Sequence, residues 1–193
     1  PLVTLAGKAG TGKTLLALAA GLHQIFAQNR YHRLTVFRPT IAVSRDLGYL
    51  PGDLGEKMRP WMQPVYDALE LIRSQDRKSV TRTLPHDVME CEEITVEPMT
   101  YIRGRSIPNQ YIVIDEAQNL TPLEVKTVIT RVGAGSKIIL TGDPHQIDNP
   151  YVDARSNGLT RLVDRFRLSP LSAHVTLVRG ERSELAETAA NIL

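Results

Sequence analysis

The sequence has few of the features that mark secreted, membrane-spanning or strongly basic proteins. It contains one cysteine, Cys91, so no disulfide can form within the chain and a reducing compartment is expected. No apolar run approaches the roughly 18 residues that a membrane-spanning helix needs, and no signal peptide is visible. The formal net charge is only +2, and aromatic residues make up 5% of the chain, so neither charge nor aromatic content alone argues for nucleic-acid binding. We therefore expect a cytoplasmic protein that does not associate with membranes.

What remains is the composition of an ordinary globular domain, with 42% apolar and 23% charged residues. A chain of 193 residues suits one domain, 1–193, and is long enough to bury a core without disulfides. The chain contains no internal repeat. It begins with Pro1 and a strand-like LVTLA, without a methionine. We expect the domain to be truncated at its N-terminus, as a piece of a longer protein.

Short apolar runs rich in β-branched residues alternate with helical patterns along the chain. This alternation predicts an α/β fold, in which a mostly parallel sheet is covered by helices on both faces. The predicted strands are 2–6, 34–38, 94–98, 111–115, 137–141 and 174–178, and the predicted helices are 11–28, 60–72 (with Pro60 in its first turn), 121–132, 158–166 and 182–193. Residues 73–93 lack a clear period, and we expect them to form a surface excursion.

The segment GKAGTGKT (7–14) fits the P-loop pattern G-x-x-x-x-G-K-[ST], between a predicted strand and a predicted helix. Glycines let backbone N–H groups surround phosphate oxygens, and the helix N-terminus favours negative charge. Lys13 can reach the β- and γ-phosphates, and Thr14 can bind Mg²⁺. A glycine turn without a ligand would leave Lys13 and Thr14 unexplained. We therefore predict that a nucleotide is bound by Gly7, Lys8, Ala9, Gly10, Thr11, Gly12, Lys13 and Thr14.

The apolar run YIVID (111–115) ends in two adjacent carboxylates. In an α/β sheet, ligands bind at the carboxyl ends of the strands. Asp115 is therefore expected to hold Mg²⁺ beside Thr14, and Glu116 to act as the base that activates water. The alternative is that both acids simply face solvent at a strand end. A base for water favours a hydrolase over a kinase.

A second polar turn follows the strand in KIILTGDPHQID (137–148). Thr141, Asp143 and Gln146 are expected near the first two motifs if the strands are neighbours. Gln146 has the chemistry to sense a γ-phosphate and the attacking water, as a glutamine does in other P-loop hydrolases. The alternative is a simple Gly-Asp-Pro turn.

Arginines provide candidates for stabilising charge in the transition state. Arg182, at the head of the last predicted helix, is the candidate catalytic arginine, and Arg179 is an alternative. A solvated first helical turn would explain Arg182 equally. Arg38 can contact phosphate or a nucleic-acid backbone. His145 is interpreted as a loop residue without a metal role, and Trp61 as a core residue.

Together these motifs resemble the first motor domain of superfamily 1 helicases and, more closely, the PhoH family of ATPases. The resemblance covers nearly the whole chain through residues 7–20, 38–67, 114–119, 141–148, 156–159 and 181–190, and LPGDLGEKMRPW (50–61) is its most family-specific part. It implies a RecA-like fold, Mg²⁺-dependent ATP hydrolysis and a link to RNA. Some members carry an N-terminal PIN nuclease domain, which we expect upstream here. One departure is Ser44-Arg45, where a glycine is expected before the aspartate.

The resemblance leads to two hypotheses about function. In the first, the domain is an ATPase that couples hydrolysis to remodelling or unwinding of single-stranded RNA, as an RNA helicase does. In the second, it is a nucleotide-dependent oligomeric switch or scaffold with little motor activity. Superfamily 1 motors close two RecA-like domains around ATP, and 193 residues leave room for one. We therefore expect a homo-oligomeric ring, for example a hexamer, in which Arg182 completes a neighbour's site.

Overall fold

The computed structural model describes residues 1–39, 54–76, 84–85, 91–102 and 104–180, with the backbone alone for 54–59. The predicted helix 182–193 and the departure at 44–45 therefore lie outside the described residues, as do residues 50–53 of the family-specific segment. Within the described ranges, no helix is both long and apolar enough to cross a membrane.

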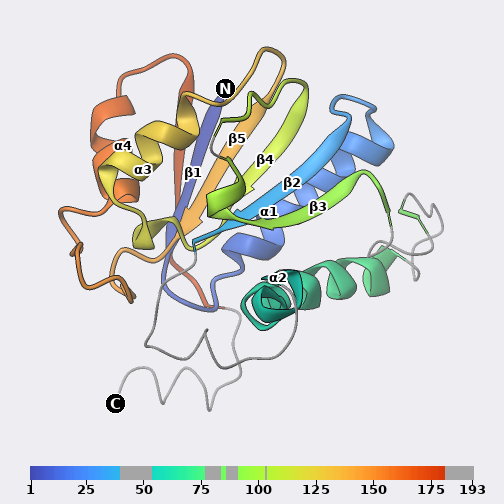
Figure 1. The fold of residues 1–193 in the computed structure, drawn as a ribbon, viewed down its shortest axis with the longest axis horizontal. Helices are drawn as coiled ribbons and strands as arrows, with labels where there is room; N and C mark the ends of the chain where they lie inside the picture. Colours follow the sequence, from blue (N-terminus) through green and yellow to red (C-terminus); the bar gives the residue numbers. More distant parts are fainter. Residues whose placement is uncertain (40–53, 77–83, 86–90, 103, 181–193) are drawn as a thin grey trace.

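Six strands form one parallel sheet, in the order β3-β2-β4-β5-β1-β6 (Figure 1). The strands are β1 (Leu2–Gly7), β2 (Arg33–Arg38), β3 (Ile94–Pro98), β4 (Gln110–Ile114), β5 (Lys137–Gly142) and β6 (Ser172–Leu177). All six predicted strands are present, and their ends differ from the predicted ones by at most two residues. The α/β, RecA-like P-loop fold is therefore confirmed. The order places β5 between β1 and β4, so the three predicted motifs end on neighbouring strands.

Helices cover both faces of this sheet. The helices are α1 (Lys13–Leu22), α2 (Leu54–Asp76), α3 (Pro122–Ile129) and α4 (Gly158–Phe166), with short turns η1 (His23–Ala27), η3 (Met99–Ile102) and η4 (Ala117–Asn119). On β4, Tyr111 and Val113 pack with the core under α1 and α2, whereas Ile112 and Ile114 pack with the core under α3 and α4. This alternation is the two-residue period of a strand buried on both sides.

The starts of two helices differ from their predictions by two residues or more. The predicted helix 11–28 begins only at Lys13, because the glycines before it adopt left-handed backbone conformations, and it passes into a π turn at His23. The prediction that Pro60 lies in the first turn of its helix is wrong, because α2 begins at Leu54. Pro60 and Pro64 lie inside α2 on its exposed side, where water can satisfy the carbonyl groups that lose their partners.

The region predicted as a surface excursion, 73–93, is described only in part. Residues 73–76 continue α2. Leu84 is half-buried against the core under α1 and α2, and its N–H donates to Asp76 at 3.2 Å. On the opposite face of the sheet, α3 starts as predicted, since Thr121 and Glu124 form a reciprocal capping box with Pro122 as the first helical residue, but it ends at Ile129, three residues before the predicted end at 132.

Candidate active site

The segment between β1 and α1 is a tight loop whose conformation requires glycine. Gly10 (φ 82°) and Gly12 (φ 79°) are left-handed. A Cβ atom added at Gly7 would lie 2.5 Å from the carbonyl oxygen of Leu177 in β6. Gly12 is also the N-cap of α1, and no side chain caps that end. The first N–H groups of α1 are therefore available to a phosphate, as the P-loop prediction requires.

The side chain of Lys13 folds back over this loop. Its Nζ atom donates to the carbonyl oxygens of Gly7 (2.7 Å) and Lys8 (2.9 Å). The hydroxyl of Thr11 donates to the same Lys8 oxygen at 2.9 Å and closes the turn. The ammonium charge is thus held inside the loop rather than in open solvent. The structure brings together every residue of the predicted phosphate-binding segment, Gly7, Lys8, Ala9, Gly10, Thr11, Gly12, Lys13 and Thr14.

Asp115, just after β4, is the point where the three motifs meet. Its Oδ1 atom accepts hydrogen bonds from the hydroxyls of Thr14 (2.7 Å) and Thr141 (2.8 Å). Thr14 is the second residue of α1, which follows β1, and Thr141 lies in β5, so the ends of β1, β4 and β5 all contribute to this contact. Asp115 is buried, and these bonds hold its carboxylate in place. The structure therefore confirms the expected proximity of Thr14 and Asp115.

This pair suits a magnesium ion. Mg²⁺ prefers oxygen ligands and usually keeps several waters, so one hydroxyl and one carboxylate beside a triphosphate are a sufficient protein contribution. In the described part of the chain, no group of three or more His, Cys, Asp or Glu side chains could hold a metal ion. Any cation at this site would therefore depend on Thr14, Asp115, water and phosphate oxygens.

Glu116 follows directly and has an unusual backbone. Its φ of 53° is left-handed, which is uncommon for a residue other than glycine. Burial, and secondly the neighbouring Asp115 carboxylate, raise the pKa of Glu116, while a hydrogen bond from Gln118 and the charges of Arg38 and Lys13 act in the opposite direction. A raised pKa strengthens a carboxylate as a general base. Position and basicity both fit the role predicted for Glu116.

Gln118, in η4, is a site residue that the sequence analysis missed. Its side chain is fully buried, and its Nε2 atom donates to Glu116 Oε2 (2.6 Å) and to the carbonyl oxygen of Gln146 (2.9 Å). Its Oε1 atom accepts from the N–H of Asp143 at 3.2 Å. Gly142 leaves room for this amide, because a Cβ atom there would lie 2.4 Å from Oε1. Gln118 therefore joins the predicted base to the loop that carries Gln146.

Asp143 fixes that loop against the P-loop. Its Oδ2 atom accepts from the N–H of Ala9 (2.9 Å), and its Oδ1 atom accepts from the N–H of His145 (3.0 Å). Its carbonyl oxygen accepts from the N–H of Gln146 at 3.1 Å. The side chain of Gln146 is itself exposed. The structure thus places Gln146 beside the site through its backbone and leaves its side chain directed to solvent.

Arg38, at the end of β2, is the second residue whose place the sequence did not determine. Its guanidinium lies 3.9 Å from Asp115 Oδ2 and 3.7 Å from Glu116 Oε1. Its Nη1 atom donates to the carbonyl oxygen of Trp61 in α2 at 2.9 Å. Trp61 is half-buried. The contact depends on β2 and β4 being adjacent, which the strand order reveals and the chain order does not.

The candidate arginines near the C-terminus are only partly described. Arg182 lies outside the described residues, and Arg179 is exposed shortly after β6. Arg182 therefore stays a prediction, as does its action on a neighbouring site.

The sheet order, the P-loop and the residues around Asp115 define a nucleotide-binding domain of the P-loop ATPase class. The chain belongs to the PhoH family, because the PhoH-like protein pattern matches residues 1–192. It is 55% identical over 193 residues to Protein PhoH2 of Bacillus subtilis, covering 100% of this chain and 43% of that protein. It is 42% identical over 193 residues to Protein PhoH2 of Mycolicibacterium smegmatis, covering 100% of this chain and 42% of that protein. The chain thus spans less than half the length of these relatives.

Solved structures show more distant likenesses. A PRRSV helicase structure gives a TM-score of 0.46 at 14% identity, covering 91% of this chain and 30% of that one. The structure of the Sulfolobus solfataricus SWI2/SNF2 ATPase core in complex with dsDNA gives a TM-score of 0.46 at 17% identity, covering 90% of this chain and 40% of that one. Neither likeness is close enough to support an argument about what this chain binds.

Proposed function

We propose that this domain binds ATP with Mg²⁺ and hydrolyses it, and that hydrolysis is coupled to remodelling or unwinding of single-stranded RNA. The observation that carries the proposal is the pair of hydrogen bonds from Thr14 and Thr141 to Asp115, because it joins a P-loop, a Mg²⁺-binding pair and a water-activating carboxylate in one place. The RNA part of the proposal comes from the likeness to the PhoH family.

Different residues have different roles in the proposed reaction. The N–H groups of the P-loop and the Lys13 ammonium bind the phosphates. Thr14 and Asp115 would hold Mg²⁺, which offsets phosphate charge and orients the γ-phosphate when bound. Glu116 accepts a proton from the attacking water, and Gln146 orients that water once its side chain turns inward. The P-loop, Thr14, Asp115 and Glu116 already lie together, whereas the role of Gln146 requires its exposed side chain to turn inward.

An arginine from a second chain completes this proposal. Among the described residues, Arg38 is the arginine that forms ion pairs with the Asp115 and Glu116 carboxylates. Because its charge is engaged by these two carboxylates, we propose that a different arginine stabilises the charge on the γ-phosphate. We assign that role to Arg182 of a neighbouring copy in a ring, for example a hexamer. Light scattering with ATP tests the assembly, and a strict monomer with full turnover would exclude it.

Cytoplasmic location and an upstream PIN nuclease domain belong to the same proposal. The sequence of the complete gene product tests whether the PIN domain is present.

Phosphate release with and without RNA tests the central claim. We expect Lys13→Ala to lose nucleotide binding and turnover together. We expect Glu116→Gln to keep ATP binding and to lose turnover by about 100-fold or more, within the range that general-base catalysis supplies. RNA should stimulate the wild-type protein. Unchanged turnover in Glu116→Gln would remove Glu116 as the base, and turnover without any response to RNA would favour the oligomeric switch.

A further inference from the structure

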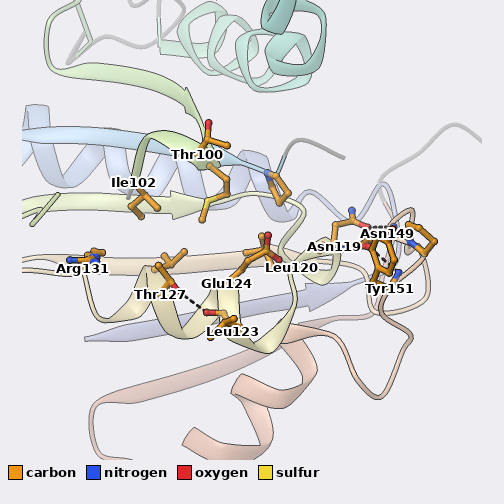
Figure 2. A pocket seen from close by; sticks show the side chains of 14 residues that line it. Thr100, Ile102, Asn119, Leu120, Leu123, Glu124, Thr127, Arg131, Asn149 and Tyr151 are labelled. Atoms are coloured by element: carbon orange, nitrogen blue, oxygen red, sulfur yellow. Dashed lines mark hydrogen bonds between the residues drawn. The ribbon is translucent and has the colours of Figure 1, made fainter. Parts of the chain in front are cut away.

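A cleft with a volume of about 590 Å³ lies next to the candidate active site. Figure 2 shows its walls: Leu123 and Thr127 from α3, Thr100 and Ile102 from η3, and Tyr151 at the end opposite Arg131. Two further lining residues follow site residues in the chain, since Asn119 comes directly after Gln118 and Asn149 comes shortly after Gln146. The cleft and the active site therefore share the segments η4 and 146–151.

Asn119 holds the 148–151 loop in a fixed conformation. Its buried Oδ1 atom accepts from the N–H groups of Asp148 (2.8 Å) and Asn149 (3.2 Å), and its carbonyl oxygen accepts from Asn149 Nδ2 (2.8 Å). Asn149 Oδ1 in turn accepts from the N–H of Tyr151 at 3.0 Å. Tyr151 is nevertheless 88% exposed. A large aromatic residue thus stands in solvent on a well-anchored backbone, where a ligand can stack on its ring.

The other lining groups suit a nucleic-acid strand. The floor contains the buried side chains of Met99, Ile102 and Leu120. Arg131 offers a positive charge at the far end, and its buried Nε atom has no hydrogen-bond partner among the described residues. Glu124, the one acid in the lining, is occupied by hydrogen bonds to the N–H and hydroxyl of Thr121. A stacking ring, an apolar floor and an arginine are the elements with which proteins hold single strands.

We propose that this cleft binds single-stranded RNA, with a base stacked on Tyr151 and a backbone phosphate at Arg131. The inference rests on the proposed function, and it names where the RNA lies. A protein partner is the less favoured occupant, because a peptide seated on the apolar floor needs no exposed aromatic ring at the mouth. The position of the cleft would also couple RNA binding to ATP hydrolysis. Gln118 bonds both to Glu116 and to the carbonyl of Gln146, so RNA on Tyr151 contacts the segment that positions the catalytic groups.

Fluorescence anisotropy of the full-length protein with labelled oligouridine of about 12 nucleotides tests the assignment. Loss of one stacked base in Tyr151→Ala should weaken binding by about 5- to 150-fold. Tyr151→Phe and Tyr151→Trp keep the ring and should bind like the wild type. Leu168→Ala, which truncates a fully exposed side chain beyond α4, is the matched control and should change nothing. Arg131→Gln should reduce the slope of log affinity against log salt by about 0.7.

Two measurements separate this inference from the proposed function. Basal ATP turnover should be equal in wild type and Tyr151→Ala, and 5-iodouridine in the oligonucleotide should crosslink to Tyr151. Absent turnover, both with and without RNA, together with Tyr151-dependent RNA binding would refute the ATPase proposal and support the cleft. Normal turnover with RNA binding indifferent to Tyr151→Ala would overturn the cleft. A change in the mass of the assembly in Tyr151→Ala would also overturn the cleft assignment, because the cleft would then be a subunit interface. Equally tight, Tyr151-dependent binding of oligodeoxythymidine would overturn the assignment to RNA.

Discussion

Replacing Gln118 by methionine tests whether the buried amide positions Glu116, the proposed base. Methionine keeps the length of the side chain but removes the donor to Glu116 and Gln146 and the acceptor for the N–H of Asp143. Water can replace the bond at the exposed Gln146 and reach the partly exposed Glu116. The N–H of Asp143 is buried, and leaving it without a partner costs about 1–3 kcal/mol. We expect the free energy of unfolding to fall by that amount in urea titrations.

The kinetic consequence is separate from the loss of stability. Glu116 without its amide partner samples positions away from the attacking water, and such misplacement costs about 100-fold in kcat. The hydrogen bond from Gln118 lowers the pKa of Glu116, so its removal raises that pKa and moves the acid limb of the pH–rate profile to higher pH. Asp115, Arg38 and Lys13 also act on Glu116, and the variant leaves all three in place.

Phosphate release measured across pH, together with ATP affinity, tests whether Gln118 positions Glu116. ATP affinity should stay near the wild-type value. Gln63→Met is the matched control, because the Gln63 amide bonds to Asp67 on the exposed side of α2 and its loss should cost only a few tenths of a kcal/mol. A Gln118→Met protein with unchanged kcat and an unshifted acid limb would refute the positioning argument. A loss of turnover that only tracks unfolding would reduce Gln118 to a structural role.

Two further substitutions test the carboxylates themselves. Thr141→Val keeps the shape of a buried side chain but removes a hydrogen bond to the Asp115 carboxylate, so we expect a loss of about 1.5–3 kcal/mol in unfolding free energy, which Thr141→Ser should restore. Glu116→Gln should raise the unfolding free energy at pH 7, because the pKa of Glu116 is raised in the folded state and its ionised form is therefore disfavoured there. The gain should be at most about 1 kcal/mol, since the side chain is 36% exposed, and it should vanish below about pH 4, where the carboxylate is protonated in both states. An undiminished gain at low pH would contradict this origin.

The sequence predicts those parts of the site that depend on a few consecutive residues. The P-loop and the acids after β4 follow from local patterns, because a strand end and a helix start fix where their side chains lie. Arg38 and Gln118 could not be placed in this way. The ion pairs of Arg38 require β2 beside β4, and the hydrogen bonds of Gln118 require the loop after β5. The start of α2 was missed for a different reason, since a proline typical of a first helical turn is also tolerated on the exposed side of a longer helix.

The charges around Asp115 support the proposal that a second copy is needed for full activity. The Asp115 and Glu116 carboxylates are offset by Arg38 and by the Lys13 ammonium, so these four side chains have no net charge. A triphosphate brings more negative charge than one divalent cation offsets, and the excess lies on the γ-phosphate where bond breaking adds to it. Arg38 cannot move to that phosphate without leaving both carboxylates and the Trp61 carbonyl. We therefore propose that the remaining positive charge comes from outside these four side chains, with Arg182 of a second copy as the candidate.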